Sequence, residues 1–242
     1  MVDTESAKEF MQEVLAKVPA EELTAIAERL ELKSRYMQQL LSRENAGKLT
    51  EQQAFQLLRL VFATRRTAKK IVEAHPAAEL QKHISDLLYG DEKVEVRFQR
   101  FCDQLGDLDP RVSTDLAGEL LHFTFPEQYW LWCRWMWDPK VRTGSLPLVV
   151  LEGSDLEAPT LGETYLKVGK AVAFVHHTGE AAGFQKISRS LYGTDVFLCS
   201  VYVIYTYTVL RMRMTQEFNK VIPELAEFTR RLLGVHKMEE FN

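Results

Sequence analysis

The sequence predicts a mainly α-helical globular protein of about ten helices, with at most one short pair of strands. In the first half of the chain, apolar residues recur at helical spacing in one segment after another. Capping residues and prolines mark where these segments begin and end. Hydrophobic residues make up 46% of the chain and charged residues 26%, which is ordinary for a globular protein with a sizeable core.

Residues 1–105 are expected to form an N-terminal helical region. Asp3 can cap a first helix, and Pro19 separates that helix from a second. Thr50 and Gln53 have the spacing of a capping box before a third helix. The later segments with the same pattern are RRTAKKIVEA, which we expect Thr64 to cap, AAELQKHISDLLYG and VEVRFQRFCDQL.

Residues 106–242 are richer in aromatic residues and are expected to share one core with the first region, as one integrated domain. All four tryptophans fall between Trp130 and Trp137. A helix that starts at Pro126 would carry aromatic side chains around most of its circumference, and such a helix is normally buried. We therefore interpret this stretch as a core helix. The alternatives are an exposed surface for a partner or an unpaired base, and a membrane-interface foot.

The remaining elements of the second half differ in how clearly the pattern indicates them. LPLVVLEG, which contains residues 148–152, is the strand candidate. Residues 196–210 are uncharged and fit either a strand or a buried helix, and we expect a helix because Thr194 can cap it and no turn interrupts it. The run is shorter than the roughly 20 residues of a membrane span. Two further helices are expected at LGETYLKVGKAVAFVHH and ELAEFTRRLLG.

Charge and cysteine content argue against several classes of protein. A net charge of −4 argues against a general nucleic-acid binder, although it leaves a local basic patch possible. The three cysteines are widely spaced and form no CxxC pair, which excludes a zinc ribbon and argues against a disulfide framework. The first residues lack the basic start and apolar run of a signal peptide. We therefore expect a reduced, cytoplasmic protein without a membrane span.

One cluster of basic residues is a candidate binding site for an anion or a partner. These residues fall on one face of a predicted helix, where like charges repel by a few tenths of a kcal/mol per pair. An anionic partner would relieve that repulsion, and a phosphate backbone is one such partner. The alternative is a solvated face balanced by Glu73 and Glu79. The residues of this basic face are Arg65, Arg66, Lys69 and Lys70.

A second candidate site is a pocket for a small acidic or phosphorylated substrate, although His122 within it fits a core histidine equally well. His176 and His177 are the one adjacent histidine pair, but neighbours on a helix point about 100° apart and rarely bind one ion. We expect no metal and no cofactor, and the sequence leaves metal binding by this pair open. The possible pocket residues are His122, Tyr129, Trp130 and Arg134.

The stretch LDPRVSTDLAGELLHFTFPEQYWLW, which covers about a tenth of the chain, resembles the middle of helix-hairpin-helix DNA glycosylase-like proteins. In that family a hairpin precedes a helix of similar pattern and an aromatic strip. The resemblance implies a DNA-binding core. The hairpin of the family is rich in glycine, whereas this chain has Leu108 to Val112 in its place, and no catalytic Lys or Asp matches.

Since no catalytic signature is found, we expect a non-catalytic cytoplasmic protein that binds another protein, as a regulatory or assembly factor. Enzymatic activity remains open. One alternative is a nucleic-acid-binding protein with a degenerate helix-hairpin-helix-like core, and another is an enzyme that acts on a small anionic substrate. The oligomeric state is not indicated.

Overall fold

The computed structural model describes residues 2–182, 190–213, 223–236 and 238. These residues form ten α-helices and no strand, so the mainly α prediction is confirmed. The helices are α1 (Thr4–Lys17), α2 (Ala20–Leu40), α3 (Glu51–Leu60), α4 (Ala68–Ala74), α5 (Ala77–Tyr89), α6 (Val94–Gln104), α7 (Pro110–Thr124), α8 (Leu161–Ala182), α9 (Tyr192–Arg213) and α10 (Leu225–Leu232), with short 3-10 helices η1 (Ala46–Lys48) and η2 (Leu146–Leu148).

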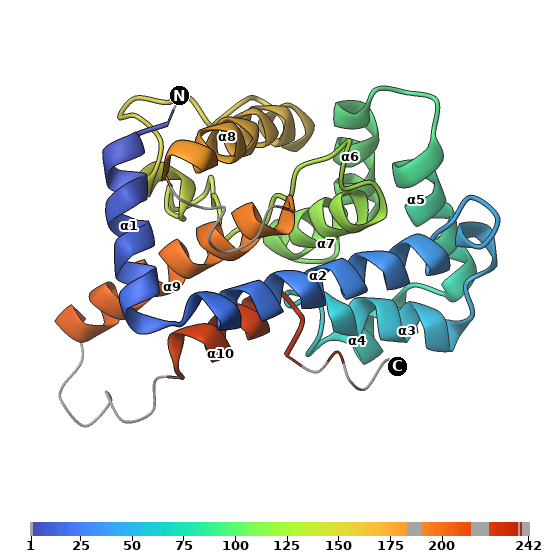
Figure 1. Cartoon of the computed structure of the whole chain (residues 1–242). Coiled ribbons are helices and arrows are strands. Elements are labelled where there is room, and N and C mark those ends of the chain that lie inside the picture. Colours follow the sequence, from blue (N-terminus) through green and yellow to red (C-terminus); the bar gives the residue numbers. More distant parts are fainter. Residues whose placement is uncertain (1, 183–189, 214–222, 237, 239–242) are drawn as a thin grey trace.

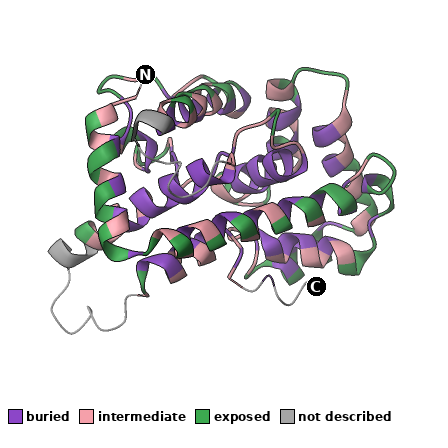
Figure 2. Cartoon of the chain, viewed as in Figure 1, coloured by how far each residue is buried: buried purple, intermediate pink, exposed green. Residues whose placement is uncertain are grey.

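Helices α7 and α9 lie in the interior, and the other helices surround them (Figure 1). The long helix α2 packs against both of them, α10 packs against α9, and α8 packs against α6 and α9. Every residue of α7 from Ser113 to Thr124 is buried. Figure 2 shows α7 and α9 mainly in the colour of buried residues, whereas α1 and α2 present exposed residues outward.

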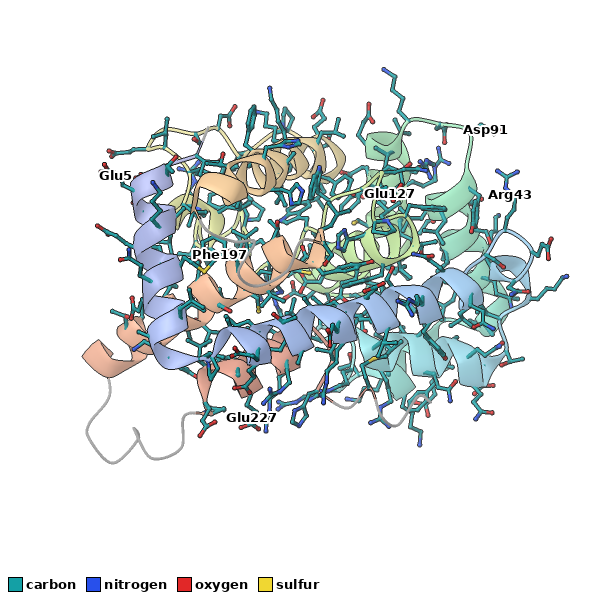
Figure 3. All side chains as sticks on the ribbon, in the orientation of Figure 1. Glu5, Arg43, Asp91, Glu127, Phe197 and Glu227 are labelled. Atoms are coloured by element: carbon teal, nitrogen blue, oxygen red, sulfur yellow. The ribbon has the colours of Figure 1, made fainter. Side chains whose placement is uncertain are left out.

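The buried apolar residues form one cluster that includes side chains from both sides of residue 105. Phe197 of α9 lies in the middle of the molecule, whereas charged residues such as Glu5 and Asp91 lie at its edge (Figure 3). Whether the two regions form one integrated domain stays a prediction.

Local capping signals in the first half are confirmed, with one correction. Asp3 accepts hydrogen bonds from two backbone N–H groups of α1, and Thr50 and Gln53 form the capping box of α3. The cap expected at Thr64 is wrong, because α4 begins only at Ala68. The Thr64 hydroxyl is buried and donates to the carbonyl of Leu58 at 2.6 Å, so it closes the turn after α3 instead.

The helix expected from Pro126 to Trp137 is wrong, because this stretch forms turns and irregular backbone. We call residues 126–150 the tryptophan segment. Its backbone groups bond to side chains of other elements, as where Asp115 of α7 accepts from the N–H of Arg134 at 2.6 Å. A Cβ on Gly118 of α7 would lie 2.1 Å from the carbonyl oxygen of Trp132. Glycine therefore lets α7 approach the segment backbone directly, and these contacts replace the hydrogen bonds of a helix.

The core role expected for this segment is confirmed for three of its tryptophans. Trp132 is 0% exposed, Trp135 3% and Trp137 7%, whereas Trp130 is only partly buried. The indole N–H of Trp132 donates to the carbonyl oxygen of Trp137 at 2.9 Å. The segment is thus a packed loop in the centre of the fold.

The strand expected at LPLVVLEG is also wrong. Leu146–Leu148 forms η2, and Val150 makes only an isolated antiparallel bridge with Val2. Residues 196–210 are helical, as expected, and belong to α9. None of the helices among the described residues combines the length and apolarity that crossing a membrane requires.

Candidate functional site

A cavity of about 200 Å³ lies where the start of α7 meets the tryptophan segment and the start of α8. We call it the Trp132 cavity. Three elements distant in sequence supply its walls, so no single motif marks it. Its lining residues are Asp109, Pro110, Arg111, Thr114, Trp132, Arg134, Trp137, Asp138, Pro139, Lys140 and Leu161.

The aromatic part of the cavity is held rigidly from behind. The ring of Trp132 stacks on Phe98 of α6 with centroids 5.7 Å apart, and Tyr165 of α8 lies beyond with its centroid 6.5 Å from that of Trp132. Trp137 is fixed through its carbonyl oxygen, which accepts from Trp132. The indole N–H of Trp137 is buried and has no hydrogen-bond partner among the described residues. Such a group is uncommon in a folded protein.

Two acidic residues of the lining share one arginine. Arg111 donates to both carboxylate oxygens of Asp109, at 3.1 and 2.9 Å, and its Nη1 lies 3.8 Å from Oδ2 of Asp138. The hydrogen bonds from Arg111 hold the pKa of Asp109 well below its usual value. Oδ1 of Asp138 accepts from the backbone N–H of Lys140 at 3.0 Å. Both carboxylates are therefore already satisfied by neighbouring donors.

Arg134 and Lys140 are the cations of the lining whose N–H groups are not all hydrogen-bonded within the described structure. Nε of Arg134 lies 3.4 Å from Oδ2 of Asp115, and its Nη1 and Nη2 have no hydrogen bond within the described residues. Burial raises the pKa of Asp115 to about 7. Lys140 is exposed and makes no ion pair with any described residue. The unengaged charge at the cavity is thus positive.

Only one residue of the possible substrate pocket, Arg134, lines the Trp132 cavity. His122 is fully buried, with Nδ1 2.8 Å from the carbonyl oxygen of Tyr129 and Nε2 2.9 Å from Oδ2 of Asp195. The ring of Trp130 lies 5.2 Å from that of His176. The structure thus brings His122 and Tyr129 into contact but places neither in the wall of this cavity.

A buried charge network surrounds His122, and the sequence reasoning missed most of it. Lys33 of α2 forms an ion pair with Glu119 of α7 and donates to the carbonyl oxygen of Leu233 at 2.9 Å. Burial raises the pKa of Glu119, although Lys33 opposes that shift. Burial alone would lower the pKa of His122, but Asp195 raises it above the usual value. The ion-paired side chains are at most 3% exposed, which indicates a structural role.

One signal in the sequence could have located Lys33. The core-facing residues of α2 include Leu30 and Met37, and position 33 lies on the same face between them. A lysine on an apolar face needs a buried partner. Nothing local identifies Glu119 as that partner, because it is 86 residues away along the chain.

The basic face lies at the surface around the start of α4. Arg66, Lys69 and Lys70 are exposed and Arg65 is partly buried. Lys69 has Glu73 at 3.8 Å, with 83% of the lysine side chain exposed. The single helix face expected for the four residues is wrong, because Arg65 and Arg66 lie in the turn before α4 and only Lys69 and Lys70 belong to the helix. All four still lie at least partly at the surface, and Lys69 is only weakly neutralised.

Within the part of the chain that the structure describes, the adjacent histidines do not belong to a cluster of metal-binding side chains. Nδ1 of His176 lies 2.9 Å from Oγ1 of Thr194, and His177 is exposed. Among the described residues no group of three or more His, Cys, Asp or Glu side chains could hold a metal ion.

Comparisons of the chain with models of protein families, with curated proteins and with solved structures give no match. The resemblance of residues 108–132 to helix-hairpin-helix DNA glycosylase-like proteins gains no support from them. The class defined here is therefore only that of an all-helical fold, and function has to be inferred from the Trp132 cavity and the charged surfaces.

Proposed function

We propose that the protein binds another protein, and that one large apolar side chain of the partner inserts into the Trp132 cavity. The size of the cavity is the observation that carries this proposal. Its volume of about 200 Å³ is below the roughly 300–1,000 Å³ of ordinary small-molecule pockets and close to that of one large side chain. A regulatory or assembly factor that works through protein contacts needs an anchor site of this kind.

The chemistry of the lining agrees with an anchor site. Pro110, Pro139 and Leu161 provide accessible apolar wall in front of the buried Trp132 and Trp137, while charged residues of both signs provide a rim. Interfaces commonly bury an apolar or aromatic anchor in a rigid pocket, and a polar rim keeps water away from it. The stacking of Trp132 on Phe98 supplies the rigidity, because the wall does not have to be ordered when a partner binds.

Filling the cavity should abolish partner binding. Peptides selected from a random displayed library on the wild-type protein should share one large apolar residue, whose change to alanine costs about 2 kcal/mol or more. Leu161→Trp places a large ring at the cavity wall and should weaken these peptides at least tenfold, measured by fluorescence anisotropy. Leu161 lines the cavity at the start of α8 and is only partly buried, so the variant should still fold.

Leu166→Trp is the matched control, because Leu166 lies on the same helix, is 43% exposed and does not line the cavity. It should bind the selected peptides as the wild type does. Selected peptides without a common apolar residue, or peptides that bind the Leu161→Trp variant normally, would contradict the proposal.

We propose polyanion binding, as in a nucleic-acid-binding protein, as a second candidate function. The exposure of Arg66 in the turn before α4, and of Lys69 and Lys70 within α4, supports it. Arg65 extends this surface toward the end of α10, because burial together with Arg231 and Arg65 lowers the pKa of His236. Charged contacts of this kind release counterions, so binding should weaken steeply with salt.

Replacing all four residues of the basic face with glutamine should separate stability from binding. The change removes repulsion between neighbouring cations, and glutamine keeps good helix propensity at positions 69 and 70 of α4, so the melting temperature should hold or rise slightly. Retention on a heparin column should fall clearly. A drop in melting temperature beyond about 2–4 °C, with unchanged retention on heparin, would instead show that the four residues of the basic face have a structural role.

The control for this variant removes the same total charge from scattered positions. It should keep most of the heparin retention if the basic face is the binding surface. Exposed lysines suitable for it are Lys8, Lys48, Lys82 and Lys93.

A further inference from the structure

The accessible side-chain donors left over at the Trp132 cavity are cationic, whereas its carboxylates already have donors of their own. Asp109 and Asp138 both lie against Arg111, and Asp138 also accepts from a backbone N–H. Arg134 keeps two terminal nitrogens without a hydrogen bond in the described structure. Lys140 is exposed and lies near enough to Asp109 to help lower the pKa of that carboxyl, but it forms no ion pair with a described residue. An apolar anchor that enters this cavity therefore meets positive charge that an anion on the same residue could neutralise.

A carboxylate is the anion that fits Arg134 best. The guanidinium group stays protonated in proteins and presents a planar fork of donors, which matches the two oxygens of a carboxylate. The Arg134 side chain is 33% exposed, so a ligand can reach it, while Asp115 behind it fixes the backbone N–H and Nε.

We propose that the Trp132 cavity recognises the C-terminal residue of a partner protein, with its apolar side chain against Pro110, Pro139 and Leu161 and its terminal carboxylate on Arg134 and Lys140. This inference rests on the proposed function of the cavity. At a chain end the carboxylate is attached to the same Cα as the anchor side chain, so both fit within one side-chain-sized site. An internal residue of a partner has a neutral amide in place of the carboxylate. It would therefore leave Arg134 and Lys140 without an anionic partner.

The test compares three short peptides that differ only in where the carboxylate lies. The probes are acetyl-Gly-Gly-Gly-Phe with a free C-terminus, the same peptide as its C-terminal amide, and acetyl-Gly-Phe-Gly-Gly amide, with leucine versions of each. Binding is measured by NMR titration of the wild-type protein. The free acid should bind about tenfold or more tightly than either amide, since a charge-assisted hydrogen bond is lost in both.

Two variants identify the groups that hold the carboxylate. Lys140→Gln should reduce the preference for the acid over the amide, and Arg134→Gln should reduce it to near one. Arg134 lies beside the buried Asp115, so Arg134→Gln could disturb folding. Lys140 is exposed and forms no ion pair with a described residue, so Lys140→Gln still tests carboxylate binding in that case. Lys48→Gln, at an exposed lysine of η1 outside the lining of the cavity, is the control and should leave the preference unchanged.

The outcomes separate this inference from the function on which it rests. Equal binding of acid and amides, blocked by Leu161→Trp, would overturn terminal recognition while leaving the cavity as an anchor site. An acid preference that survives both Arg134→Gln and Lys140→Gln would also overturn it. Failure of all three peptides to bind, in both phenylalanine and leucine versions, would count against the cavity as an anchor site and therefore against both proposals.

Discussion

Replacing Trp132 with alanine is expected to lower the free energy of unfolding by about 3–5 kcal/mol. Trp132 is 0% exposed and stacks on Phe98 with an interplanar angle of 18°. The substitution would leave a large cavity in the centre of the fold and would remove the donor to the carbonyl oxygen of Trp137. Since glycine at position 118 already places α7 against the backbone of Trp132, the surrounding structure cannot collapse far into the space.

Chemical denaturation of the wild type and the variant measures this loss directly. Trp130→Ala is the matched comparison, because Trp130 is only partly buried and should cost clearly less. A loss below about 1 kcal/mol for Trp132→Ala would contradict its central packing role.

Replacing Lys33 with methionine is expected to cost about 3–5 kcal/mol at neutral pH. The substitution keeps the length of the side chain but removes the cation that faces the buried carboxylate of Glu119. Glu119 can escape its isolation by binding a proton, because burial already raises its pKa above the usual value. A carboxyl group with a raised folded-state pKa loses stability as pH rises, so the loss should grow from pH 5 to pH 8.

The double variant Lys33→Met, Glu119→Leu separates charge isolation from lost packing. It removes both ions together and should be more stable than Lys33→Met alone, although the carbonyl of Leu233 loses its donor in both. Denaturation at the two pH values checks this. A single variant that is as stable as the double one, with no pH dependence, would show that the ion pair is unimportant.

The parts of the fold that could be predicted are those governed by neighbours in the sequence. The caps at Asp3 and Thr50 act within three residues, so the pattern alone locates the starts of α1 and α3. The length of the uninterrupted apolar run was likewise enough to predict that residues 196–210 form a helix, which is part of α9. In each case the hydrogen bonds that decide the structure are local.

The tryptophan segment could not be predicted because distant residues decide its conformation. Its aromatic composition correctly indicated burial, but its backbone bonds to Asp115, His122 and Tyr165 from other helices. The local spacing of apolar residues, which predicted a helix here, does not indicate these distant partners. The same holds for the Trp132 cavity, for which only Arg134 was identified in advance, as a member of a different pocket.

The bond from Lys33 to the carbonyl oxygen of Leu233 joins residues 200 positions apart, which has a consequence for how the protein is made. On the ribosome, α2 emerges long before its buried lysine can find either acceptor. At roughly 5–20 residues per second, the wait for the Leu233 end lasts about ten seconds or more. During that time the ammonium group of Lys33 is hydrated, and the face of α2 that packs against α9 and α10 stays uncovered. The native contacts of α2 can therefore be completed only after the segment around α10 has left the exit tunnel.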